Sequence, residues 1–191
     1  VRTHGGPHLV VAAGKDGHVY GTERASGRRV YATVVSTQEN LDGPLTGKGA
    51  RFCPGVNGGV EWNGPSYSPA TNLLYVGSVD WCTTLATYGA DQPHKLKGKQ
   101  ALPWTGSNKL SAPFGVNDST RRGWLTAVDA DDGSIRWRYA SPTPIIAGVT
   151  ATAGGVVVTG DLSGNVLAFD ARDGRELWRY ATGAPIGGGV I

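Results

Sequence analysis

The sequence is poor in the residues that build zinc and haem sites. It contains no methionine and two cysteines, Cys53 and Cys82. Neither cysteine lies in a CxxC or CxxCH motif, so a structural zinc site and a c-type haem are not supported. A disulfide between the two cysteines would indicate an oxidising compartment, and a pair of buried free thiols is the alternative.

Other absences narrow the class of protein. No apolar run reaches about 18 residues, so we expect no transmembrane segment in this piece. GxSxG, Walker and HExxH motifs do not occur. The net charge is +3 and no basic-aromatic motif accompanies it, so we expect no nucleic-acid partner. Because the chain lacks an initial methionine and opens within a strand-like pattern, we interpret it as part of a longer protein.

The abundant residues favour an all-β chain. Glycine accounts for 30 of the 191 residues, and the sequence also has 11 prolines, 6 tryptophans and 7 tyrosines. Glycine-rich turns combined with valine and aromatic residues are typical of many short strands. We therefore expect strands and tight turns along most of the chain.

One hairpin occurs twice in the sequence. Residues 163–180 (SGNVLAFDARDGRELWRY) closely repeat residues 123–139 (GWLTAVDADDGSIRWRY). Counterparts in the two copies are 41 residues apart: Asp129 and Asp170, Gly133 and Gly174, Trp137 and Trp178. In each copy the aspartate can bond the backbone of its own turn, and the glycine supplies the left-handed residue that closes the loop. A weaker third copy, GHVYGTERASGRRVYAT, has Tyr31 at the tryptophan position.

The spacing of the copies predicts a β-propeller. A period of about 40 residues with four strands per unit is typical of propeller blades. We predict three four-stranded blades, at residues 8–35, at 58–84 together with 123–140, and at 146–181. Residues 85–122 would form a long loop insertion within the second blade, and residues 186–191 would begin a further blade. Because propellers close with about four to eight blades, missing sequence or a partner must cover the open sides. A β-sandwich is the alternative, and in-register repetition argues against it.

Three stretches of the sequence resemble one known family. AGVTATAGGVVVTGDLSGNVLAFDARDGRELWRYATGAPIGGGVI resembles the closing blades of the pyrroloquinoline-quinone (PQQ)-dependent alcohol dehydrogenases. CPGVNGGVEWNGPSYSPATNLLYVGSVDWC and LVVAAGKDGHVYGTERASG resemble earlier blades of the same proteins. The resemblance covers nearly all of the chain except residues 85–122. It implies part of an eight-bladed quinoprotein propeller that oxidises an alcohol, sugar or polyol by hydride transfer to PQQ.

The resemblance also implies what surrounds the reaction. Family members hold PQQ beside a calcium ion or similar metal, which polarises the quinone carbonyl. The metal ligands and the catalytic aspartate belong to earlier blades, so we expect no catalytic residue and no metal ligand in this piece. The implied electron acceptor is a quinone or cytochrome, and the implied location is periplasmic or extracellular.

The resemblance implies that four residues contact the cofactor: Lys15, Glu61, Trp62 and Gly148. Lys15 in AGKDG matches a basic residue beside the reactive carbonyls, where a cation stabilises developing negative charge; a hairpin turn with a solvated lysine is the alternative. Glu61 in GGVEWN stands where relatives have an asparagine that bonds the quinone. A carboxylate beside a tricarboxylate cofactor must be protonated or paired, for which Lys15 is the candidate. Trp62 follows it and is expected to line the funnel.

The remaining implied positions concern one loop and the scaffold. Ile146 stands where other relatives have a cofactor-contacting tryptophan, and since isoleucine cannot donate a hydrogen bond, backbone N–H groups of the Gly148 stretch must make the contact. Cys53 and Cys82 align with a disulfide found in some members. The family's tryptophan-docking positions, which are structural, match Tyr31, Trp137 and Trp178.

A second class of function remains open. A non-catalytic propeller of the same repeat family would act as a scaffold or sensor in protein–protein interaction. The long insertion, the paired cysteines and the stretch EWNGPSYSP favour the dehydrogenase, because a simple scaffold needs none of them.

Overall fold

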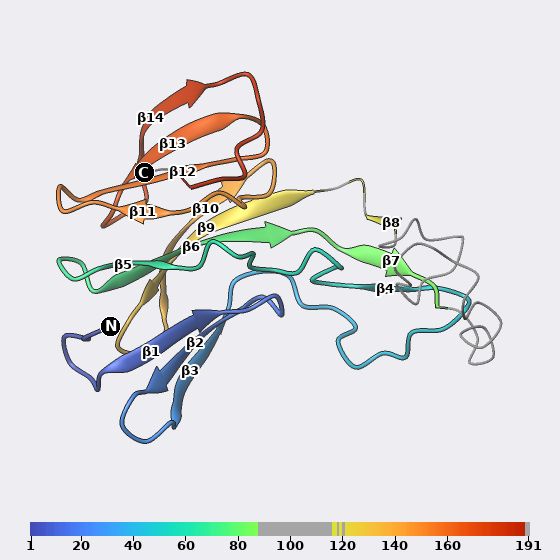
Figure 1. The fold of residues 1–191 in the computed structure, drawn as a ribbon, viewed down its shortest axis with the longest axis horizontal. Helices are drawn as coiled ribbons and strands as arrows, with labels where there is room; N and C mark the ends of the chain where they lie inside the picture. The colour runs from blue at the N-terminus through green and yellow to red at the C-terminus, as the bar shows by residue number, and fades with distance from the viewer. Residues whose placement is uncertain (88–115, 118, 120, 190–191) are drawn as a thin grey trace, which may run out of the picture.

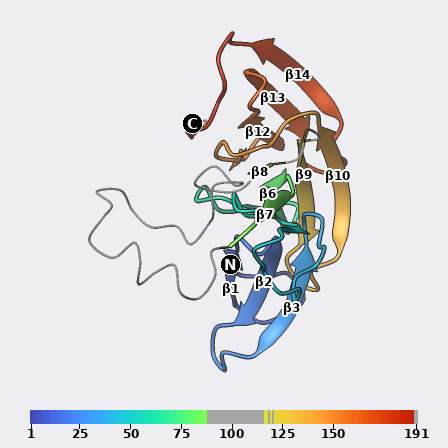
Figure 2. The same ribbon diagram turned by 90° about the vertical axis from the view of Figure 1, so that its right-hand side faces the viewer.

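The computed structural model describes residues 1–87, 116–117, 119 and 121–189, and the regular structure in this part of the chain is entirely β. Most strands belong to three antiparallel sheets, which fan out from one another in Figure 1. Figure 2 shows the sheets following one another along an arc, in chain order from the N-terminal sheet (blue) to the C-terminal sheet (red). This arrangement confirms the predicted fold class, a set of propeller blades with open sides.

The strands of each sheet are close together in the sequence, with one interruption in the second sheet. The first sheet, in the order β1-β2-β3, contains β1 (Leu9–Ala13), β2 (His18–Glu23) and β3 (Arg29–Val34). The second, in the order β10-β9-β6-β5, contains β5 (Ser66–Ser68), β6 (Leu73–Asp80), β9 (Arg122–Asp129) and β10 (Ile135–Ser141). The third, in the order β11-β12-β13-β14, contains β11 (Thr150–Ala151), β12 (Val156–Gly160), β13 (Asn165–Asp170) and β14 (Glu176–Ala181).

The first sheet differs from the expected four strands. It has three, and the segment before them folds back so that Arg2 bridges His8 beside the start of β1. The amino group of Val1 donates to Leu9 O at 2.7 Å, and Leu9 N–H donates to Val1 O. The N-terminal segment thus lies beside β1 in the position that β5 occupies beside β6 in the second sheet, but it makes too few backbone hydrogen bonds to count as a strand.

A small fourth sheet lies outside the blades. It has the order β4-β7-β8 and consists of β4 (Ala50–Phe52), β7 (Thr83–Leu85) and β8 (Val116–Asn117). Val116 and Asn117, from the stretch predicted as a loop insertion, therefore pair with Thr84 and Thr83, and β7 pairs on its other side with β4. The rest of that stretch, 88–115, 118 and 120, lies outside the described residues. So do residues 190–191 of the predicted further blade, and residues 186–189 form no strand.

The junctions between blades repeat one contact. Trp137 on β10 packs against the third sheet, where its indole N–H donates to Ala171 O at 3.1 Å. Its ring fills the space above Gly174, where an added Cβ would lie 2.5 Å from the indole. Tyr31 on β3 sits in the same way over Gly133, at 2.4 Å from an added Cβ. Each aromatic residue therefore needs a glycine in the DxxxG turn of the next blade.

Two hydrophobic clusters follow these junctions. The cluster between the first and second sheets contains Leu9, Val19, Tyr31, Val35, Val60, Leu74, Val76, Val128 and Ala130. The cluster between the second and third sheets contains Leu73, Tyr75, Leu125, Ala127, Trp137, Ile145, Val149, Val157, Leu167, Phe169 and Ala171. In β6, whose eight residues are all buried, Leu73 and Tyr75 belong to one cluster and Leu74 and Val76 to the other, so this part of the strand packs on both faces.

Candidate functional site

The loops at the two ends of the strands form two opposite faces of the blades, and the residues implied to contact the cofactor lie on one of them. On one, which we call the Lys15 face, lie the turn 14–17, the segment 57–64 that leads into β5 and the segment 144–149 that leads into β11. Backbone hydrogen bonds join these segments: Gly59 N–H donates to Lys15 O at 2.7 Å, Val79 N–H to Gly59 O and Ile145 N–H to Ser78 O. The DxxxG turns lie at the other ends of the strands, on the opposite face.

Lys15 and Glu61 form an ion pair on the Lys15 face. Lys15 Nζ lies 2.8 Å from Glu61 Oε2 and donates a second bond to Asn57 O at 2.9 Å. The side chain of Glu61 is 8% exposed, whereas that of Lys15 is 63% exposed. A nearly buried carboxylate needs such a partner. The pairing expected for these two residues is therefore present, and the ammonium group stays accessible from solvent.

Two glycines allow the first blade to approach the second at this point. An added Cβ at Gly58 would lie 2.8 Å from the Lys15 side chain, and one at Gly59 would lie 2.4 Å from the Cα of Gly17. Contacts this short exclude a side chain at either position. The GG pair in front of Glu61 thus sets the distance between the lysine turn and the glutamate.

A narrow crevice beside the ion pair joins the two loop segments of this face. It is lined by Val60, Glu61, Asn63, Gly64, Gly77, Ile145, Ile146 and Ala147. Glu61 and Ile146, which are far apart in the sequence, therefore line the same crevice. The Nδ2 group of Asn63 is buried and has no hydrogen-bond partner among the described residues.

The other two implied contact residues are placed differently. The N–H of Gly148 donates to Gly188 O at 3.0 Å, so this amide already has a partner. The side chain of Trp62 is among the most exposed large hydrophobic groups, at 72%, and does not line the crevice. Their contacts with a cofactor remain predictions.

The cysteines lie at the edge of the same region. Cys53 and Cys82 form a disulfide that ties the segment after β4 to the residues just beyond β6. Nearby, the carboxylate of Asp80 accepts hydrogen bonds from Thr37 N–H, Arg122 Nε and Trp124 Nε1 at 3.0, 2.8 and 2.9 Å. Burial raises the pKa of Asp80, but these donors outweigh it and leave the pKa below its ordinary value. Together the bridge and the carboxylate hold the end of β6.

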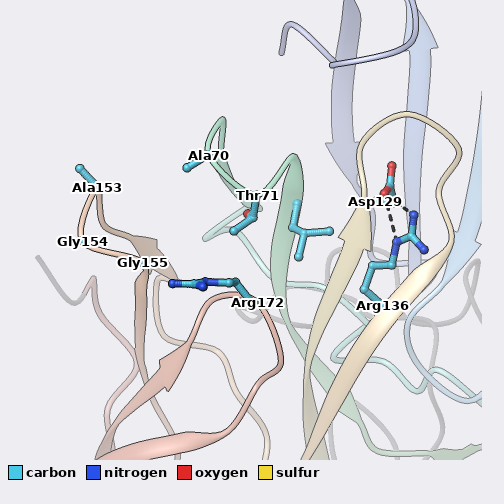
Figure 3. A pocket seen from close by; sticks show the side chains of 9 residues that line it. Ala70, Thr71, Asp129, Arg136, Ala153, Gly154, Gly155 and Arg172 are labelled. Atoms are coloured by element: carbon cyan, nitrogen blue, oxygen red, sulfur yellow. Dashed lines mark hydrogen bonds and ion pairs between the residues drawn. The ribbon is translucent and has the colours of Figure 1, made fainter.

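A larger pocket lies on the opposite face, between the second and third blades (Figure 3). Its volume is about 880 Å³, and it is lined by Ala70, Thr71, Leu73, Asp129, Arg136, Ala153, Gly154, Gly155 and Arg172. Figure 3 shows Arg136 turned toward Asp129, at 2.8 Å, and Arg172 extending toward the turn that contains Gly155. No residue implied to contact the cofactor lies in this pocket.

The described part of the chain lacks two further features. It has no group of three or more His, Cys, Asp or Glu side chains that could hold a metal ion. Within it, no helix is long and apolar enough to cross a membrane.

Comparison with known proteins connects this geometry to a family. Residues 121–189 match the family described as outer membrane protein assembly factor BamB. The quinoprotein ethanol dehydrogenase of Pseudomonas putida is 33% identical over 141 residues, which are 71% of this chain and 20% of that protein. The lanthanide-dependent methanol dehydrogenase of Methylacidiphilum fumariolicum is 29% identical over 117 residues, 59% of this chain and 18% of that protein. The chain thus spans about a fifth of these relatives.

Solved structures show the same fold. A quinohemoprotein alcohol dehydrogenase from Comamonas testosteroni matches with a TM-score of 0.77 and 21% identity, covering 99% of this chain and 30% of that one. A europium-containing methanol dehydrogenase matches with a TM-score of 0.73 and 23% identity, covering 96% of this chain and 34% of that one. The fold and its repeated aromatic–glycine junctions define a propeller of the quinoprotein type. The chain belongs to the PQQ-dependent alcohol dehydrogenase family and spans part of the length of its members.

Proposed function

We propose that this chain supplies part of the cofactor site of a PQQ-dependent dehydrogenase that oxidises an alcohol, sugar or polyol. The observation that carries the proposal is the Lys15–Glu61 ion pair, in which the carboxylate is nearly buried and the ammonium group stays accessible. An accessible cation held by a nearly buried carboxylate suits a cofactor that carries carboxylate and carbonyl oxygens. The residues present therefore fit PQQ.

Each residue has a defined task in this proposal. PQQ, when bound, supplies the two-electron acceptor for the hydride that leaves the alcohol carbon. The Lys15 ammonium group stabilises negative charge on a cofactor oxygen, since it is held in place by Glu61 and stays accessible. The Glu61 carboxylate orients that ammonium group and reduces the net charge of the site. The base that takes the hydroxyl proton lies outside this chain, as do the ligands of the calcium ion or similar metal.

The setting of the reaction follows from the same proposal. The disulfide between Cys53 and Cys82 supports an oxidising compartment, which for this class is the periplasm or the extracellular space. Electrons then pass to a quinone or cytochrome acceptor.

A second candidate function rests on the family match of residues 121–189. That match covers the repeated hairpins and omits Lys15 and Glu61. A non-catalytic propeller that acts as a scaffold or sensor would keep the hairpins and would not need the ion pair.

Reconstitution of the full-length protein separates the two candidates. With PQQ, calcium and an artificial electron acceptor, the dehydrogenase should reduce the dye when a primary alcohol or sugar is added, and quinone absorbance should remain after desalting. If neither signal appears with any substrate of these classes, the enzymatic function is wrong and the scaffold function is favoured.

A further inference from the structure

The pocket between the second and third blades has room for a ligand and contains a cation whose charge is unmatched. Its volume of about 880 Å³ lies within the roughly 300–1,000 Å³ that is typical of ligand pockets. Two arginines and one aspartate line it. Arg136 is engaged with Asp129, to whose Oδ2 it donates from Nε at 3.1 Å and from Nη2 at 2.8 Å. The remaining cation is Arg172, which extends toward the turn that contains Gly155 (Figure 3).

The residues around Arg172 do not neutralise its side chain. In the part of the chain that the structure describes, Arg172 donates one hydrogen bond, from its backbone N–H to Asp170 at 2.9 Å, and none from its guanidinium group. Asp173, on the same turn, accepts from the backbone N–H of Arg175 at 2.9 Å. Neither aspartate lines the pocket. The guanidinium group of Arg172 is therefore available to a ligand.

The first junction shows what occupies the equivalent groove. There the turn 3–7 of the first blade reaches over to the second blade. His4 Nε2 lies 2.7 Å from Pro69 O, and Gly5 N–H donates to both carboxylate oxygens of Asp131, at 3.1 and 3.2 Å. A polypeptide segment thus lies in that groove, and the charged side chain of the neighbouring blade holds it.

The second junction has the opposite charge and lacks such a segment among the described residues. Arg172 stands at the position of Asp131, 41 residues later in the repeated hairpin. The turn of the second blade, 69–72, is one residue shorter than its counterpart in the first, and no hydrogen bond within the described chain joins it to Arg172 or to the turn 153–155. An added Cβ at Gly155 would meet no atom within 4 Å, so the surface of that turn is open.

We propose that this pocket binds an acidic peptide segment of a partner protein, and that Arg172 holds a carboxylate of that segment. A guanidinium group can donate two parallel hydrogen bonds to a carboxylate, which suits the free group of Arg172. Ala70, Leu73 and Ala153 give the pocket apolar surface for the neighbouring parts of the peptide. A peptide is favoured over a small anion because a polypeptide segment fills the equivalent groove at the first junction.

A labelled peptide of three aspartates flanked by glycines, with blocked ends, serves as the probe. It is titrated into the full-length protein without PQQ and followed by fluorescence anisotropy. We expect saturable binding, and binding at least tenfold weaker for the same peptide with asparagines in place of the aspartates. Arg172→Gln should weaken binding of the acidic peptide roughly 10- to 100-fold, the range for losing a hydrogen bond between charged groups.

Arg175 provides the matched control. It is exposed, belongs to the same turn and has the same charge, but it does not line the pocket. Arg175→Gln should leave the affinity for the acidic peptide nearly unchanged, because a solvated charge outside the pocket contributes little. Arg172→Asp, which gives the second junction the charge of the first, should abolish binding of the acidic peptide.

Three results would overturn the inference. One is a wild-type protein that does not bind the acidic peptide. Another is an equal loss of affinity in Arg172→Gln and Arg175→Gln, because binding would then follow surface charge alone. The third is displacement of the peptide by inorganic phosphate at the concentration of the peptide, which would indicate a site for small anions. The inference does not depend on PQQ, and Arg172→Gln should bind PQQ as the wild type does.

Discussion

At both blade junctions an aromatic ring packs over a glycine, but the polar group of the ring has a hydrogen-bond partner at only one of them. At the second junction Trp137 covers Gly174 and its N–H donates to Ala171 O. At the first junction Tyr31 covers Gly133, but its hydroxyl is buried without a partner among the described residues. Burial, with the nearby aspartates, raises the pKa of Tyr31 to about 12. The shape of the docking contact thus survives the change of residue, whereas its hydrogen bond does not.

A third aromatic residue, Trp178, occupies the docking position but has no neighbouring blade among the described residues. Trp178 on β14 occupies the position that Trp137 has on β10, yet it is 53% exposed and Trp137 only 9%. No described blade follows β14, so Trp178 stacks on Tyr180 instead, with ring centroids 5.9 Å apart. The repeat therefore determines which residue docks, and the neighbouring blade determines what the docking contributes.

The largest effect should come from removing the second junction. Trp137→Ala should lower the free energy of unfolding by about 3–5 kcal/mol, because it leaves a cavity and removes one of the two hydrogen bonds that Ala171 O accepts, the other coming from the Tyr75 hydroxyl. Trp178→Ala in the same chain should change it by less than about 1 kcal/mol, because its ring is half exposed. Urea unfolding of the two variants measures the difference. Equal losses would show that Trp178 is covered.

Removing the disulfide should have the next largest effect. Replacing Cys53 and Cys82 with serine should lower the free energy of unfolding by about 3–4 kcal/mol, since the bridge closes a loop with a sequence separation of 29 residues. Unfolding under reducing conditions should give the wild-type protein the same loss and leave the double variant unchanged. A variant that still responds to reductant would contradict this account.

The carboxylate beside the bridge predicts a pH effect. Because the folded pKa of Asp80 is lowered, its contribution is complete above the unfolded value of about 3.9 and is lost as the pH falls through the folded pKa. Asp80→Asn should lower the free energy of unfolding by about 1–3 kcal/mol at pH 7. The urea midpoints of the two proteins should begin to converge as the pH falls below about 4 and should meet once the pH is below the folded pKa of Asp80. A difference that persists at pH 2 would rule out the charge as its cause.

The smallest effect should occur at the first junction. Tyr31→Phe removes a buried hydroxyl that lacks a partner and keeps the ring over Gly133. The free energy of unfolding should therefore stay the same or rise by about 1 kcal/mol. Thermal unfolding measures the change, and a clear loss would mean that the hydroxyl is bonded in the protein.

Periodic features could be predicted from the sequence, and features built from single contacts could not. The 41-residue offset of the two hairpins sufficed for the propeller fold, because every blade needs the same turn and the same docking residue. The pairing of Lys15 with Glu61 was one of two possibilities that the family resemblance raised, the other being a protonated Glu61.

Three structural features could not be predicted from the sequence, because no periodic pattern or motif encodes them. The sheet β4-β7-β8 joins short strands from distant parts of the chain, and strands of two or three residues carry no recognisable period. The Gly148 amide finds its partner 40 residues away, at Gly188, through a backbone contact that no side chain announces. Asn63 stands out only because its amide is buried without a partner, which is a property of the folded loop.

The central claim is that the Lys15 face contributes to a PQQ site. Its most direct test is a PQQ titration of the full-length wild-type protein and of the Lys15→Ala variant, with calcium present, followed by fluorescence quenching. The account predicts saturable binding of one PQQ per chain by the wild type and at least tenfold weaker binding by the variant. Absence of binding by the wild type, or equal affinities of the two proteins, would contradict it.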